Sequence, residues 1–146
     1  MNILALDVAT KTGFATRNTS GTWNLTPKRD SSGGMRLIEF EKRVKDICAT
    51  DGINLVVFER SAGFHKSALI VQAELHGVLK AFCERNNIEY RAYSAGEIKK
   101  FATGKGNAKK PQMIAAAEEK YKVTVIDDNH ADALHLYHLA KKDYAE

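Results

Sequence analysis

Short β-prone runs alternate with polar turn residues over the first 25 residues of the chain. Residues 2–7, 13–17 and 22–25 are three such runs, and Lys, Thr, Asn, Ser and Gly separate them. Short runs bounded by turn-forming residues are typical of strands joined by tight connections. The pattern therefore predicts an antiparallel meander at this end of the chain.

Longer stretches with helical spacing begin after a loop at residues 26–34. Residues 35–49 place apolar side chains near helical spacing with charged residues between them, which predicts an amphipathic helix. Residues 54–58 (NLVVF) are apolar apart from Asn54, as expected for a strand covered on both faces. Residues 67–84 predict a second helix, and because its small and apolar residues occupy more than one stripe, we expect burial on two sides.

The rest of the chain predicts one more strand at residues 88–93 and then only helices, around 97–102, at 111–120 and from about 127 onward. Three consecutive strands are followed by two strands that alternate with helices. This order predicts an α/β fold, with a mixed five-stranded sheet flanked by helices. No linker or internal repeat divides the sequence. We therefore expect residues 1–146 to form a single domain.

Composition narrows the class of protein. A length of 146 residues suits one domain, and 44% hydrophobic residues argue against disorder. No apolar run approaches the roughly 20 residues that would span a bilayer, and the N-terminal segment lacks the features of a signal peptide. We therefore expect a cytoplasmic protein with no membrane contact, in which Cys48 and Cys83 are reduced core residues.

The positive charge of the chain is concentrated in one segment. The chain has 22 Lys and Arg against 18 Asp and Glu, and residues 98–117 contain no acid. This segment holds five lysines, which are Lys99, Lys100, Lys105, Lys109 and Lys110. A concentrated basic loop indicates a phosphate backbone as partner, although a solvated surface loop would have the same composition.

Acidic residues stand where predicted elements end or begin. Asp7 ends the first strand and Glu59 follows the apolar strand at 54–58. If these strands are parallel neighbours, both side chains emerge at the same edge of the sheet, where ligand sites of α/β proteins gather. Asp128 and Asp132 are four residues apart and share one face of the last helix. The pattern predicts a cluster of three or four carboxylates.

Such a cluster is unfavourable unless a cation neutralises it. Oxygen ligands without cysteine favour magnesium or manganese over zinc. Each acid also has a purely structural interpretation: Asp127 or Asp128 can serve as a helix N-cap, and a single strand-end acid such as Asp7 or Glu59 commonly faces solvent. The coincidence of these acids, rather than any one of them, indicates a metal site.

Five motifs resemble those of a known family of nucleases. They are ILALDVATKTGFA, VVFERSAGF, QAELHGVLKAF, EIKKFATGKGNAKKPQM and NHADAL, in this order along nearly the whole chain. The first motif alone also resembles the opening of sugar kinases and actin-like ATPases. Together the motifs resemble RuvC-type Holliday junction resolvases of the RNase H-like superfamily, and in particular the phage-encoded branch of that family.

The resemblance implies roles for individual residues. It implies that Asp7, Glu59 and Asp132 bind metal, and that Lys99 and Lys110 lie near the scissile phosphate. Cellular relatives often have Asp or His three residues before the final Asp, where this chain has Asn129. The fourth ligand therefore stays open among Asp128, Asn129 and His130. We favour Asp128, because it shares the helix face of Asp132 and because carboxylates bind magnesium better than amides do.

The resemblance also implies an activity. It implies a homodimeric, magnesium-dependent endonuclease, with manganese as a substitute, that resolves four-way junctions and other branched DNA. Two ions per site would give 5′-phosphate and 3′-hydroxyl ends, and the self-interface would be the helix at residues 67–84. DNA contacts are expected at Lys11, Phe64, Lys99, Lys100, Lys105, Lys109 and Lys110. A nuclease for RNA or RNA/DNA hybrids, or a non-catalytic nucleic-acid-binding module, are the alternatives.

Overall fold

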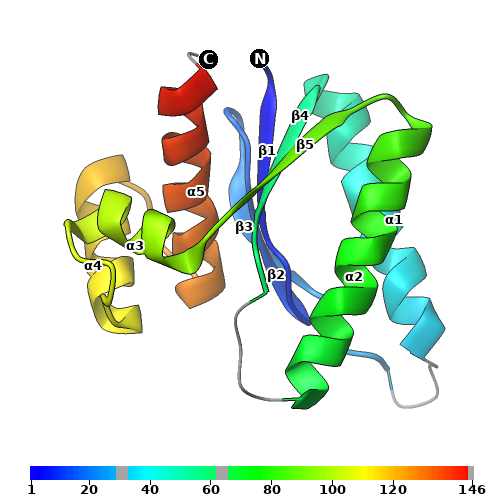
Figure 1. Cartoon of the computed structure of the whole chain (residues 1–146), viewed down its shortest axis with the longest axis horizontal. Helices are drawn as coiled ribbons and strands as arrows, with labels where there is room; N and C mark the ends of the chain where they lie inside the picture. Colours follow the sequence, from blue (N-terminus) through cyan, green and yellow to red (C-terminus); the bar gives the residue numbers. More distant parts are fainter. Residues whose placement is uncertain (29–32, 62–65, 145–146) are drawn as a thin grey trace.

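The computed structural model describes residues 1–28, 33–61 and 66–144 (Figure 1). The strands are β1 (Ile3–Asp7), β2 (Lys11–Ala15), β3 (Ser20–Asn24), β4 (Leu55–Glu59) and β5 (Glu89–Tyr93). The helices are α1 (Gly33–Asp51), α2 (Lys66–Arg85), α3 (Ala95–Thr103), α4 (Lys110–Tyr121) and α5 (Asp128–Tyr144). None of the helices in these ranges is both long enough and apolar enough to cross a membrane.

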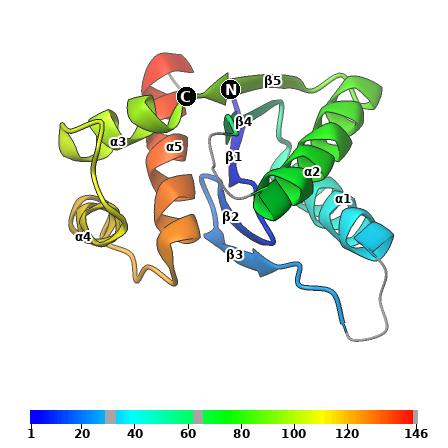
Figure 2. The same ribbon diagram turned by 60° about the horizontal axis from the view of Figure 1, so that its bottom comes forward.

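The five strands form one mixed sheet in the order β3-β2-β1-β4-β5. The pairs β1–β2 and β2–β3 are antiparallel, whereas β1–β4 and β4–β5 are parallel. Helices α1 and α2 cover one face of the sheet, and α3, α4 and α5 cover the other (Figures 1 and 2). The predicted N-terminal meander and the mixed five-stranded sheet are confirmed.

The predicted bounds of two strands are wrong by about two residues. Strand β2 begins at Lys11 rather than at residue 13, and β3 begins at Ser20 rather than at residue 22. The turn between them is closed by Thr16, whose amide donates to the carbonyl of Thr19 at 2.7 Å and whose hydroxyl accepts from the amides of Asn18 and Thr19. A side chain therefore sets this turn, and the apolar pattern does not show it.

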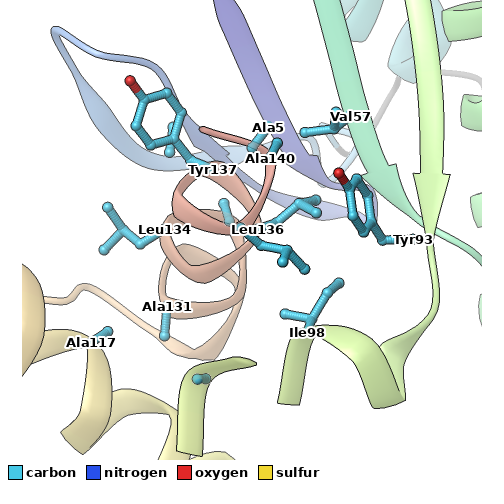
Figure 3. Packing of buried hydrophobic residues seen from close by; sticks show 14 of the residues in the cluster. Ala5, Val57, Tyr93, Ile98, Ala117, Ala131, Leu134, Leu136, Tyr137 and Ala140 are labelled. Atoms are coloured by element: carbon cyan, nitrogen blue, oxygen red, sulfur yellow. The ribbon is translucent and has the colours of Figure 1, made fainter. Parts of the chain in front are cut away.

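Alternation along the strands divides the core between the two faces of the sheet. Ile3 and Ala5 face α5, whereas Leu4 and Leu6 face α1 and α2. Figure 3 shows the part of the core between the sheet and α5, in which Ala5 lies near Leu136 and Ala140 of α5. On this alternation Asp7 belongs to the face that α5 covers.

The two predicted core cysteines are buried in the layer between the sheet and helices α1 and α2. Cys48 and Cys83 are buried and form no disulfide, and Trp23 stacks on Phe14 with 4.8 Å between ring centroids. The prediction that the helix at 67–84 is buried on two sides does not hold within a single chain. There α2 buries one stripe, formed by Leu75, His76, Leu79, Phe82 and Cys83, and the other sides of the helix stay exposed or only partly buried.

Helix α5 packs against β1 and β2 at very short range. A Cβ added to Gly13 of β2 would overlap the backbone carbonyl group of Asn129 in the first turn of α5. Gly13 pairs with Asp7 across the β1–β2 ladder. The absence of a side chain at Gly13 therefore allows the first turn of α5 to approach the end of β1.

We expect Gly13→Ala to destabilise the fold, because backbone atoms of α5 must move to admit the methyl group. Overpacking of this kind typically costs about 1–3 kcal/mol, which thermal unfolding would detect. Gly96→Ala is the matched control, since no atom lies within 4 Å of an added Cβ in α3. Equal melting temperatures for the two variants would contradict the close approach.

Candidate functional site

The ends of β1 and β4 bring two acids to the same edge of the sheet. The parallel register pairs Leu6 with Phe58, so Asp7 and Glu59 are the next residues in register. Asp7 is only 7% exposed and Glu59 is partly buried. Both strands place their odd-numbered residues toward α5, so the two carboxyl groups extend toward that helix.

Helix α5 adds two acids to this pair. The carboxyl groups of Asp7 and Asp132 are hydrogen-bonded to each other. Burial raises the pKa of Asp7 well above its usual range, and the nearby carboxyls of Asp132, Glu59 and Asp128 raise it further. The structure therefore brings together four predicted site residues that lie up to 125 positions apart in the sequence.

The pKa of Asp132 shows the same crowding. Burial is the main cause that raises this pKa to about 7, and the charges of Glu59 and Asp128 add to it. The charge of Lys99 and the hydrogen bond from Asp7 act in the opposite direction. A carboxyl group with this pKa is partly protonated at neutral pH, so repulsion within the cluster is relieved in part by bound protons.

Two of the predicted lysines lie beside the acids. Burial raises the pKa of Glu59, and the charge of Lys99 from α3 opposes that rise. The Nζ atom of Lys110, at the start of α4, lies 3.5 Å from a carboxylate oxygen of Asp128, with the lysine side chain 80% exposed. Lys110 can therefore turn toward another anion at little cost, because exposed ion pairs contribute little to stability.

The other predicted DNA-contacting residues are placed less specifically. Lys11, Lys100, Lys105 and Lys109 are exposed, and Lys105 and Lys109 lie in the segment between α3 and α4. Side chains hold the backbone of that segment, because the Lys105 amide donates to the Thr103 hydroxyl and the Lys109 amide donates to the side-chain oxygen of Gln112. Phe64 lies outside the described residues.

At the start of α5, one residue caps the helix and a different residue joins the acid cluster. Asp127 is the N-cap, because its Oδ1 accepts from the amide of His130 and from the hydroxyl of Thr22, each at 2.8 Å. The His130 ring is buried and bound at both nitrogens, to the Ile126 amide and to the Ser20 hydroxyl. Of the three residues left open as the fourth ligand, Asp128 is the one whose charge acts on both Asp7 and Asp132.

Sequence reasoning did not assign roles to several polar residues that reach this edge. The Thr12 hydroxyl donates to the carbonyl of Ala9 at 2.6 Å and closes the turn that follows Asp7. From α2, Gln72 donates to the carbonyl of Val8 and His76 contacts Ser61. A polar residue in the buried stripe of α2 was the available signal for His76.

The donor set suits a hard divalent cation. Within the described residues, no three His, Cys, Asp or Glu side chains form a ready arrangement for a metal ion. The carboxyl groups of Asp7 and Asp132 are instead hydrogen-bonded to each other. Each of the four carboxyl groups either raises the pKa of a neighbour or has a raised pKa itself. A cation with oxygen ligands would relieve this repulsion.

We expect Asp132→Asn to stabilise the metal-free protein at about pH 8 while leaving it little changed near pH 4. The raised pKa of Asp132 means that its protonated form favours folding. This contribution is fully present below the ordinary pKa of 3.8 and is lost as pH rises through about 7. Calorimetry with a chelator measures the difference, roughly 2–4 °C for each 1 kcal/mol relieved.

Asp46→Asn is the control for this comparison, because Asp46 is an exposed acid on α1. Added magnesium should raise the melting temperature of the parent chain at pH ~8 more than that of Asp132→Asn. A lower melting temperature for Asp132→Asn than for Asp46→Asn under chelation would contradict the repulsion.

The sequence matches no protein-family model. A segment of 69 residues is 38% identical to the crossover junction endodeoxyribonuclease RuvC of Brachyspira hyodysenteriae. The segment makes up 47% of this chain and 42% of that relative, so the match spans less than half the length of the curated relative.

Solved structures extend the similarity over nearly the whole chain. Thermus thermophilus RuvC gives a TM-score of 0.76 at 16% identity, over 99% of this chain and 97% of that one. The same organism's RuvC in complex with Holliday junction substrate gives 0.78 at 16% identity, over 99% and 94%. The yeast mitochondrial Holliday junction resolvase gives 0.65 at 11% identity, over 97% and 82%. These values establish the RNase H-like fold that the motifs implied.

Proposed function

We propose that this chain, which resembles RuvC-type Holliday junction resolvases in sequence and in fold, is a structure-selective endodeoxyribonuclease that resolves four-way junctions and other branched DNA. The observation that supports the proposal most directly is the gathering of Asp7, Glu59, Asp128 and Asp132 beside Lys99 and Lys110. The names of the similar proteins refer to the same activity. The phage-encoded branch remains a prediction from the motifs.

The four carboxylates are the proposed ligands of two magnesium ions, for which manganese would substitute. Bound ions in such a site supply charge neutralisation and activate a water for attack on phosphorus. Burial and the neighbouring acids raise the pKa values of Asp7 and Asp132, and metal ligands must be charged, so metal binding would release protons. The products of this hydrolysis would be 5′-phosphate and 3′-hydroxyl ends.

The lysines act on the DNA in this proposal. Lys99 and Lys110 bind the scissile phosphate and offset the negative charge that develops on it. Lys11, Lys100, Lys105 and Lys109 contact neighbouring phosphates, which position the junction without reading its sequence. Phe64 is proposed to stack on an unpaired base, a contact typically worth ~1–3 kcal/mol.

The main experiment replaces Asp7, the most buried acid of the cluster, by asparagine. We expect Asp7→Asn to reduce cleavage of a synthetic four-way junction by a factor of at least ~10³, because one ligand charge is lost while the shape is kept. Junction affinity measured in calcium or without metal should stay within about twofold, since the lysines are untouched. Asp46→Asn on α1 is the matched control and should cleave normally.

The same assay compares a four-way junction, a Y-shaped fork, a linear duplex and an RNA/DNA hybrid. Preference for the junction over the linear duplex supports the proposal. Preferred cleavage of the hybrid would instead favour the alternative nuclease, and binding without cleavage of any substrate would favour the non-catalytic module.

A self-interface on α2 completes the proposal. A four-way junction has two-fold symmetry, so paired cuts require two sites related by a dyad. Helix α2 leaves Ile70 53% exposed, and Ala73, Gly77 and Ala81 are exposed as well. Small and apolar residues on one side of a long helix suit close packing against a second copy of the chain.

We expect the protein to run in solution at about twice its chain mass of 16.2 kDa at micromolar concentration. Gly77→Arg should shift it to a monomer that makes single rather than paired nicks. Ala49→Arg, on the exposed side of α1, adds the same charge elsewhere and should leave the mass unchanged. A monomeric parent protein in light scattering would contradict the interface.

A further inference from the structure

Helix α2 touches the segment that follows β1 from the face of the sheet opposite α5. The Nε2 group of Gln72 donates a hydrogen bond to the carbonyl of Val8 at 3.0 Å. Val8 follows Asp7 directly and is fully buried. This bond fixes the backbone immediately beyond the Asp7 carboxyl, where pairing with β4 has already ended at Leu6.

One turn further along α2, His76 contacts one residue before Glu59 in the sequence and one residue after it. Its ring lies against Phe58, with 4.9 Å between ring centroids, and its Nδ1 is 3.3 Å from the hydroxyl oxygen of Ser61. Phe58 precedes Glu59, and Ser61 follows it by two residues. From the neighbouring strand β5, the carbonyl of Tyr93 accepts a hydrogen bond from the Arg60 amide at 2.8 Å. The backbone around Glu59 is therefore held from two directions.

Packing alone does not account for a histidine at position 76. The residue is 7% exposed, and its Nε2 has no hydrogen-bond partner among the described residues. Burial, with a smaller effect from Lys80, lowers the pKa of His76 to about 4, so the ring is neutral. An unpaired buried nitrogen is unfavourable, and an apolar ring would fill the same space without that cost. What histidine adds here is the polar contact with Ser61.

We propose that Gln72 and His76 are positioning residues that together set the separation between the Asp7 and Glu59 carboxyl groups. Gln72 holds the segment after β1 and His76 holds the segment after β4, and one rigid helix carries both. The role rests on the proposed function, because it concerns the same metal ligands. It adds two residues outside the acid cluster that act on metal binding through the backbone.

The test compares Gln72→Leu and His76→Phe with Asn86→Leu. Asn86, just beyond the end of α2, also donates from a side-chain amide to a backbone carbonyl, that of Phe82 at 2.8 Å, but far from both strand ends. Substitution of residues that orient metal ligands typically costs about 10–100-fold in metal affinity or activity. We expect losses in that range for the two α2 variants, and none for Asn86→Leu.

Two readouts separate positioning from simple destabilisation. Electron paramagnetic resonance measures Mn²⁺ affinity of the protein without DNA, and steady-state cleavage at saturating junction measures kcat apart from junction affinity. We expect weaker Mn²⁺ binding and lower kcat, with junction affinity unchanged. His76→Asn, which keeps a polar atom near the Nδ1 position, should recover most of the loss. Ser61→Ala removes the other partner without disturbing the core and should reproduce the effect of His76→Phe.

Mn²⁺ affinity and kcat that fall no further in Gln72→Leu and Ser61→Ala than in Asn86→Leu would overturn the positioning role while leaving the nuclease proposal intact. A parent protein that neither binds Mn²⁺ nor cleaves any branched substrate would overturn the proposed function, and the positioning role with it.

Discussion

Electrostatic repulsion among four carboxyl groups is the constraint around which this structure is arranged. Asp7, Glu59, Asp128 and Asp132 come from three elements. Burial first, and the neighbouring acids second, raise the pKa values of Asp7 and Asp132, so the site disfavours their charged forms. A compact core holds them together despite this cost. The parallel β1–β4 ladder fixes two of the acids, and α5 fixes the others through its Asp127 cap and its close packing on Gly13.

The distribution of lysines limits that cost without removing it. Lys99 and Lys110 act on the cluster directly, whereas the remaining lysines of the segment are exposed. The site therefore places a cluster of carboxyl groups beside lysines that carry positive charge. This combination suits a substrate that is itself a polyanion and needs cations at its reacting phosphate.

The pattern of apolar and polar residues predicted much of the fold. The apolar run at 55–58 indicated a strand covered on both faces, and strand-end acids with an i, i+4 pair indicated the cluster. The bounds of β2 and β3 were missed because the Thr16 side chain closes their turn. The Asp7–Asp132 hydrogen bond, the overlap that an added Cβ at Gly13 would produce, and the unpaired Nε2 of His76 were beyond reach, since each depends on contacts between distant segments.

Helix α2 has two functional sides in the proposed arrangement. One side touches the backbone after Asp7 and around Glu59, and the other exposes Gly77 and Ala81. Thermodynamic reciprocity then relates the two sides. In the proposed dimer, whatever factor the docking of a second chain contributes to cation affinity, cation binding must contribute to docking, so any coupling between assembly and metal loading acts equally in both directions.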